Sequence, residues 1–173
     1  MVECVADWMG WSDVRGIAAT KDALGKKWRG IQLPGRYADG HAIPWFQVAT
    51  LPASQLKGED ATGATWIASA NTSFKISQRA QSPRGVVVCN LMSGRLAIVN
   101  LGQGHTLFLR VNEQEYPFVV DQANTTLVLQ RTVLGVFRGS VNYDGSEINR
   151  RSWRKVDMAG KVATLRPEKY DVW

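Results

Sequence analysis

The stretch best equipped for binding chemistry is NRRSWRKV, residues 149–156, which places four cations and one tryptophan in eight positions without an acid. A smaller group of the same kind, KKWRG, surrounds Trp28. Lysine and arginine neutralise phosphates, and an indole stacks on a nucleic-acid base for about 1–3 kcal/mol. The same pairing suits an anionic membrane, where tryptophan prefers the interface and each cation contributes about 1 kcal/mol.

We therefore predict that these two groups bind an anionic partner, either RNA, a nucleoprotein or an anionic membrane surface. The predicted residues are Arg150, Arg151, Trp153, Arg154, Lys155, Lys26, Lys27 and Arg29. A purely structural role is the alternative. On a strand, Arg151, Trp153 and Lys155 would share one face of an exposed edge, where cations discourage aggregation. On a helix, Trp153 would instead lie beside Arg150.

Residues for catalysis are scarce, since His41 and His105 are the only histidines. No local motif joins either of them to a nucleophile, and a four-ligand zinc site would need more histidines or cysteines. The turn GQG at 102–104 precedes a strand-like segment rather than the helix that a phosphate-binding loop requires. We therefore expect a protein that is not an enzyme and holds no cofactor or metal. An enzyme with dispersed carboxylates or a His41-centred site is the third alternative.

The length of 173 residues fits one domain, and the net charge of +6 with a pI of about 9.6 is moderately basic. Residues 135–173 carry eight cations and five anions, so the excess is greatest there. Cys89 lies in the apolar run GVVVCNLM, which predicts a buried free thiol, while a disulfide with Cys4 is the other option. Without a signal sequence or a long apolar run, we expect a cytoplasmic protein, in the producing or host cell or in a virion.

The first 30 residues have helical periodicity. Ser12 can cap a helix, and an apolar stripe follows at Val14, Ile17, Ala18, Leu24 and Trp28. In this interpretation Trp28 completes the stripe, and the neighbouring lysines suit the helix end. We expect residues 1–40 to form a helical arm and residues 41–173 to form an antiparallel β domain.

The β domain is predicted from short runs rich in Val, Leu, Ile, Thr and Phe, about ten residues apart and separated by turn signals. They are PWFQVATL, ATWIAS, TSFKIS, GVVVCNLM, RLAIVNL, HTLFLRV, YPFVVD, TTLVLQ, VLGVFRGSVNY and KVATLR. Such spacing leaves no room for helices between strands and favours an antiparallel sandwich or a partly open barrel. The fold class is therefore α+β, mainly β, and we detect no internal repeat.

Aromatic residues lie near both ends of the sequence. Trp8, Trp11, Tyr170 and Trp173 would suit self-association, although the C-terminal pair would also suit packing back on its own domain. Together these features predict a structural or assembly protein, similar to viral matrix or coat proteins as a class, that forms a homo-oligomer and contacts an anionic partner. A monomeric β-barrel that binds single-stranded nucleic acid is the second hypothesis.

Overall fold

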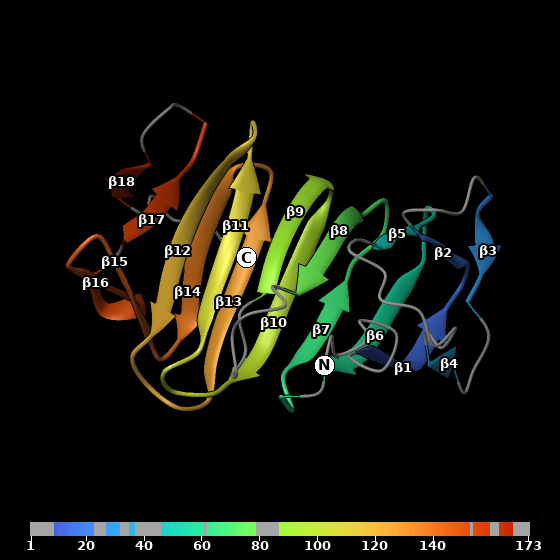
Figure 1. Ribbon diagram of the computed structural model, residues 1–173, viewed down its shortest axis with the longest axis horizontal. Coiled ribbons are helices and arrows are strands. Elements are labelled where there is room, and N and C mark those ends of the chain that lie inside the picture. The colour runs from blue at the N-terminus through green and yellow to red at the C-terminus, as the bar shows by residue number, and fades with distance from the viewer. Residues whose placement is uncertain are drawn as a thin grey trace.

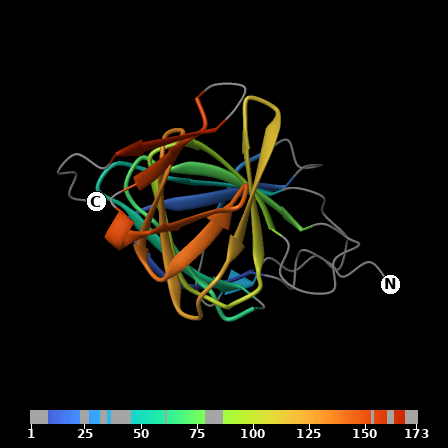
Figure 2. The same cartoon turned by 90° about the vertical axis from the view of Figure 1, so that its left-hand side faces the viewer.

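Two nine-stranded β-sheets face each other and enclose one hydrophobic core (Figures 1 and 2). The computed structural model describes residues 9–22, 27–31, 35–36, 46–60, 62–78, 87–152, 154–159 and 163–167. The strands follow one another along the long axis, with β16 and β18 at one end and β3 and β4 at the other (Figure 1). The sandwich alternative of the sequence prediction is the one that agrees with this architecture.

Each sheet collects strands from the whole length of the chain. Sheet A has the order β18 (Thr164–Pro167), β17 (Arg154–Asp157), β14 (Val133–Arg138), β13 (Thr125–Gln130), β10 (Arg95–Leu101), β7 (Thr65–Ala68), β6 (Gln55–Asp60), β1 (Met9–Arg15) and β4 (Gly35–Arg36). Sheet B has the order β16 (Ser146–Asn149), β15 (Ser140–Tyr143), β12 (Gln114–Val120), β11 (Thr106–Val111), β9 (Val87–Ser93), β8 (Ser73–Gln78), β5 (Phe46–Thr50), β2 (Ala18–Asp22) and β3 (Arg29–Gly30).

The core forms because apolar residues alternate with polar ones along most strands, so that one face of each sheet turns inward. In β13, for example, Leu127 and Leu129 are buried in the core, as the alternation predicts. Trp66 on β7 is also buried, and its indole N–H donates to the Asp60 carboxylate at 2.7 Å. The predicted strands over 95–101 and 125–130 have the bounds of β10 and β13.

The predicted helical arm is wrong, because the described part of the N-terminal region contains strands. Ser12 lies inside β1 and pairs its hydroxyl with the Lys57 carbonyl, so it caps no helix. Gly16 has a φ of +75°, outside the helical region, and turns the chain from β1 in sheet A to β2 in sheet B. Pairing with β6 and β5 therefore overrides a periodicity that resembled an amphipathic stripe.

Successive hairpins alternate between the two sheets instead of forming a simple meander. Strands β11 and β12 pair in sheet B, β13 and β14 pair in sheet A, and β15 and β16 return to sheet B. Strand β10 crosses alone to sheet A, so its neighbours β9 and β11 run parallel to each other. The single run predicted over 133–143 is divided for the same reason, since the chain changes sheets at Gly139.

One corner arrangement recurs where the chain crosses between the sheets. A glycine with positive φ stands on one crossover and a buried serine or threonine on the neighbouring crossover, in the pairs Gly16 and Ser54, Gly94 and Thr72, and Gly139 and Thr125. At Gly94, the next residue Arg95 donates its backbone N–H to the Thr72 hydroxyl at 3.0 Å. A Cβ on Gly94 would lie 2.5 Å from the Thr72 Cα. Only glycine fits this corner.

The hydroxyl side of each corner has its own sequence signal. The residue before the serine or threonine has positive φ in all three cases: Ala53 at 56°, Asn71 at 54° and Asn124 at 58°. Asparagine tolerates this region better than most residues, and threonine is short enough to bond the facing backbone. The repeated dipeptide Asn-Thr at 71–72 and 124–125 therefore has a structural role. The repetition is too short and too widely spaced to appear as a sequence repeat.

Candidate anionic-partner surface

The segment NRRSWRKV is divided between three elements. Asn149 ends β16, residues Arg150–Ser152 form the 3-10 helix η2, and β17 begins at Arg154. The strand alternative does not hold across this segment, because Arg151 lies in η2 whereas Lys155 lies in β17. Strand β17 is not a sheet edge either, since it pairs with both β14 and β18. Trp153 lies outside the described residues.

A neighbouring strand supplies an aromatic ring that the sequence analysis did not select. Phe137 lies near the end of β14 and is 47% exposed. Its neighbour Val136 pairs with Leu127 in the core, and Arg138 pairs with Thr126. Phe137 is the extra residue of a bulge between these pairs, and a bulge re-aims the side chains that it displaces. The bulge accounts for a large apolar ring at the surface.

Arg150 connects this ring to η2. Its guanidinium carbon lies 4.9 Å from the centre of the Phe137 ring, a cation–π contact worth about 0.5–1 kcal/mol at an exposed site. Arg138, Arg150 and Arg151 are all exposed. We name these four residues, Phe137, Arg138, Arg150 and Arg151, the basic–aromatic patch. It joins residues of β14 and η2 that are separated in the sequence but adjacent in space.

The cations of the patch are not neutralised within the described part of the chain. None of the three guanidinium groups forms an ion pair there with a carboxylate. Glu147, on β16, instead accepts a hydrogen bond from the Asn149 amide at 3.0 Å. The patch therefore combines positive charge that no described carboxylate pairs with an exposed ring, which is the chemistry needed to bind phosphates beside a planar or apolar group.

The second predicted group lies at the opposite end of the molecule. Lys27 and Trp28 are exposed, Trp28 at 45%, and the backbone of Arg29 begins β3. This end of the sandwich is far from η2 along the long axis (Figure 1). No helix contains Trp28, so the proposed helix stripe does not explain it. The structure thus separates the two cationic groups instead of joining them, and Lys26 lies outside the described residues.

The other predicted residues have mixed positions. Trp11 is buried in the core of the sandwich, so its indole stabilises the monomer. Trp8, Tyr170 and Trp173 lie outside the described residues. Arg154 and Lys155 belong to β17, where Lys155 pairs with Gly135. Phe137 and Arg138 were missed because their signal, a bulge that breaks the inward alternation after Val136, requires knowledge of the strand pairing.

The groups suited to catalysis are dispersed. His105 precedes β11 in a turn and is half-buried, whereas His41 lies outside the described residues. No group of three or more His, Cys, Asp or Glu able to hold a metal occurs in the parts of the chain that the structure describes. Cys89 is a free buried thiol, as predicted, and burial raises its pKa to about 12. At neutral pH it is therefore an unreactive core residue.

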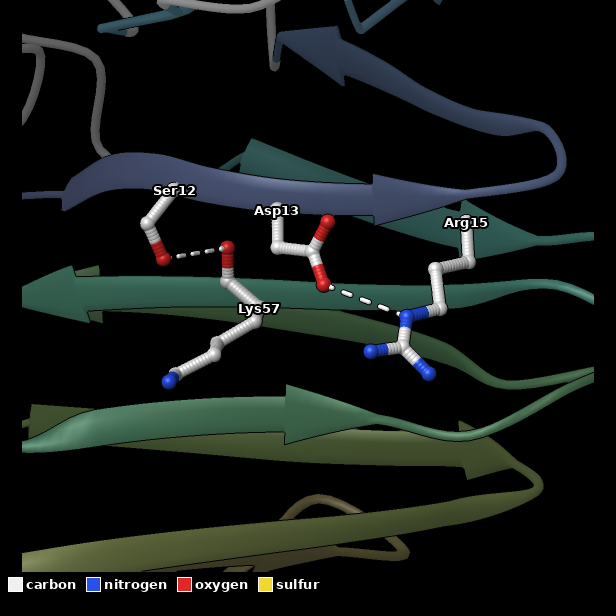
Figure 3. A network of polar contacts seen from close by, with 4 residues as sticks. All are labelled: Ser12, Asp13, Arg15 and Lys57. Atoms are coloured by element: carbon white, nitrogen blue, oxygen red, sulfur yellow. Dashed lines mark hydrogen bonds and ion pairs between the residues drawn. The ribbon is translucent and has the colours of Figure 1, made fainter.

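At the N-terminal end of sheet A the surface is an ordinary polar one (Figure 3). Arg15 pairs with Asp13 at 3.4 Å, and the Ser12 hydroxyl donates to the carbonyl of Lys57 at 3.3 Å. Exposed ion pairs of this kind contribute at most about 1 kcal/mol. Here opposite charges are interspersed, whereas the cations of the basic–aromatic patch form no ion pair with a described carboxylate. No described helix is long and apolar enough to cross a bilayer.

Comparisons with known proteins give no family. No protein-family model matches the chain, and no curated protein does. Among solved structures, it is similar to the crystal structure of a "putative anti-sigma factor" from Parabacteroides distasonis, with 10% sequence identity and a TM-score of 0.46. The match covers 72% of this chain and 60% of that chain. A likeness at this level carries no functional argument.

Proposed function

We propose that this protein is a non-enzymatic structural or assembly protein that self-associates and contacts an anionic partner through the basic–aromatic patch. The exposed Phe137 ring beside three arginines without ion pairs to described carboxylates is the observation that supports this proposal. Viral matrix and coat proteins are a class of proteins that combine self-association with a basic surface. This is an analogy of surface chemistry and implies no evolutionary relationship.

Three of the four outer strands of the sandwich are poorly suited to self-association by strand pairing. The outer strands β3 and β4 have two residues each, and β18 ends with Pro167, which has no backbone N–H to donate. Short edge strands and edge prolines discourage pairing between sheets of different molecules. An oligomer of this chain would therefore use the outer faces of the sandwich or the remaining edge strand, β16.

Co-sedimentation with RNA and with anionic liposomes, each at two salt concentrations, tests the contact with the partner. The test variant changes Arg138, Arg150 and Arg151 to Gln. The control changes Arg15, Lys21 and Lys57 to Gln, with the same loss of charge on β1, β2 and β6. We expect at least tenfold weaker binding for the patch variant and a smaller loss for the control. Equal losses for the two variants would reject the patch as the binding site.

Light scattering over a range of concentrations tests the assembly part of the proposal. We expect the mass to rise with concentration and to rise further when the bound partner is added. A strict monomer at high concentration that also fails to assemble on RNA or vesicles would refute the proposal.

The second hypothesis, single-strand nucleic-acid binding, gains support from the same ring, because an exposed aromatic can stack on any base. Phe137→Ala and Phe137→Leu distinguish the hypotheses. Stacking predicts that both substitutions weaken RNA binding about tenfold while liposome binding changes less. If Leu preserves RNA binding, the ring acts only as apolar surface, and the single-strand hypothesis fails.

A further inference from the structure

The outer face of sheet B carries a small group of apolar residues on β11 and β12. Phe108, Pro117 and Val119 each stand between two buried residues of their own strand, so they belong to the outer face. Phe108 pairs with Pro117, and Val119 follows two residues later. Pro117 is exposed, Val119 is 40% exposed and Phe108 is half-buried. We name these three residues the apolar cluster.

Polar residues flank the apolar cluster on both sides. Lys75 on β8 pairs with Asn90 on β9, the strand next to β11. On the other side, Val119 pairs with Asn142 on β15, which pairs with Glu147 on β16. An apolar centre with a polar rim is the usual anatomy of a surface that binds another protein.

The two sides of this rim carry opposite charges. Lys75 stands between two buried residues of β8 and is half-buried, and Glu147 is exposed. Neither forms an ion pair within the part of the chain that the structure describes. Arg110 and Glu115, which lie on the same face, already pair with each other at 2.5 Å. Lys75 and Glu147 are therefore the charges that this face offers to a partner.

Lys75 and Glu147 lie at equal distances from the apolar cluster, in opposite directions. Lys75 is two strands from Phe108, across β9, and Glu147 is two strands from Pro117, across β15 (Figure 1). Along the strands, the two charges lie two residues away on opposite sides of the row that Phe108 and Pro117 form. Each charge is therefore about 12 Å across the strands and about 7 Å along them from the middle of that row.

This spacing is self-complementary. In a dimer with two-fold symmetry, the same surface of both copies forms the contact. A two-fold axis that lies in the interface, passes through the Phe108–Pro117 pair and is perpendicular to the line from Lys75 to Glu147 exchanges these two positions. Lys75 of each copy then faces Glu147 of the other copy, and the two apolar clusters meet at the centre.

The area of the face suits a weak dimer. The strands from β8 to β16 span five strand spacings, about 24 Å, and β11 and β12, with six and seven residues, are about 20 Å long. The projected area is therefore about 480 Å² per copy, or about 1,000 Å² for the two copies together. This is the lower limit for a specific interface, so dimers should form as the concentration rises.

We propose that the outer face of sheet B, from β8 to β16, is the self-association surface of this protein, and that it binds a second copy around a two-fold axis. The inference rests on the self-association part of the proposed function and names the face that carries it. The interface uses no residue of the basic–aromatic patch, so the arginines of the patch stay available to the anionic partner.

A charge exchange tests the pairing between copies, with the full-length protein in sedimentation equilibrium at low salt. The wild type should pass from monomer to dimer without larger species. Lys75→Glu and Glu147→Lys should each raise the dissociation constant of the dimer at least fivefold, because each places like charges opposite one another at two points. The double variant should return to within twofold of the wild type. Unaffected single variants, or a double variant as weak as either single one, overturn the inference.

A second pair of variants tests the apolar cluster. Val119→Asp should raise the dissociation constant at least tenfold, because it places a carboxylate at the centre of the contact. The matched control is Ile17→Asp, at an aliphatic residue that is 61% exposed between β1 and β2, and it should leave dimerisation unchanged. If Val119→Asp dimerises like the wild type, the inference fails and self-association uses another surface. If the wild type stays monomeric at every concentration, the inference fails together with the self-association part of the proposed function.

Discussion

Two rows of residues in register, one on the outer face of each sheet, differ in chemistry. Across β2, β5, β8 and β9 of sheet B the row is Lys21, Gln47, Lys75 and Asn90, all polar, although Phe108 and Pro117 pair on the same face of β11 and β12. Across β7, β10, β13 and β14 of sheet A the row is Ile67, Ala97, Val128 and Gly135, which has no polar side chain. Both sheets bury equally apolar inner faces, so the difference is not a requirement of the core. It is accompanied by a difference in burial, because Val128 is 5% exposed whereas Lys75 is half-buried.

Both outer faces exist only while the two sheets stay packed together, and the glycine corners connect the sheets. We therefore expect the largest loss of stability from a substitution at a corner. In Gly94→Ala the new Cβ would overlap Thr72 and the carbonyl of Asn71 at a φ of +81°, so unfolding free energy should fall by about 3 kcal/mol or more. Gly63→Ala is the matched control, since φ is +86° there but no atom lies within 4 Å. It should lose only about 1 kcal/mol in chemical denaturation. Equal losses of unfolding free energy in the two variants would show that the contact with Thr72 contributes nothing beyond the backbone strain.

A charge placed on each outer face separates the faces directly. Val128→Asp buries a carboxylate and should reduce the free energy of unfolding by about 2–3 kcal/mol. Lys75→Asp, on the polar face, should change it by at most about 0.5 kcal/mol. Urea denaturation of both variants measures the difference. A Val128→Asp protein as stable as the wild type would mean that the outer face of sheet A is open to water.

At neutral pH the smallest effect concerns Cys89, which lies on the inner side of sheet B and whose titration changes stability only in alkaline solution. Burial raises the pKa of its thiol from 9.0 to about 12, so the folded state keeps a proton that the unfolded state loses. The contribution of Cys89 to stability is therefore complete below pH 9 and is lost as pH rises from 9 towards 12. The slope is at most about 1.4 kcal/mol per pH unit. Relative to Cys89→Ala, denaturation curves should show this loss only above pH 9, and parallel pH dependences would contradict it.

The strands were predictable where local pattern and tertiary environment agree. β10 and β13 alternate cleanly, and both have the predicted bounds. The helical prediction failed over residues 9–22 because alanine, valine and isoleucine can satisfy a helical stripe as well as a strand. Pairing with β5 and β6, which come later in the chain, decided between the two.

The candidate surface was predictable only in part. The cations of residues 150–155 are visible in the sequence, since charge density needs no partner to be detected. Phe137 is not, because its exposure arises from a bulge against β13 and its contact with Arg150 joins two separate elements. The two Asn-Thr dipeptides are likewise visible in the sequence, but their structural role depends on glycines elsewhere in the chain.

The sequence by itself determined the β-rich class, the apolar inner faces and the concentration of positive charge after residue 134. These properties follow from composition and from alternation between neighbouring residues. Tertiary structure alone decided which residues share an outer face, because strands from distant parts of the chain pair side by side. It therefore also decided that Phe137 meets Arg150 and that Val128 lies between two residues too small to cover it.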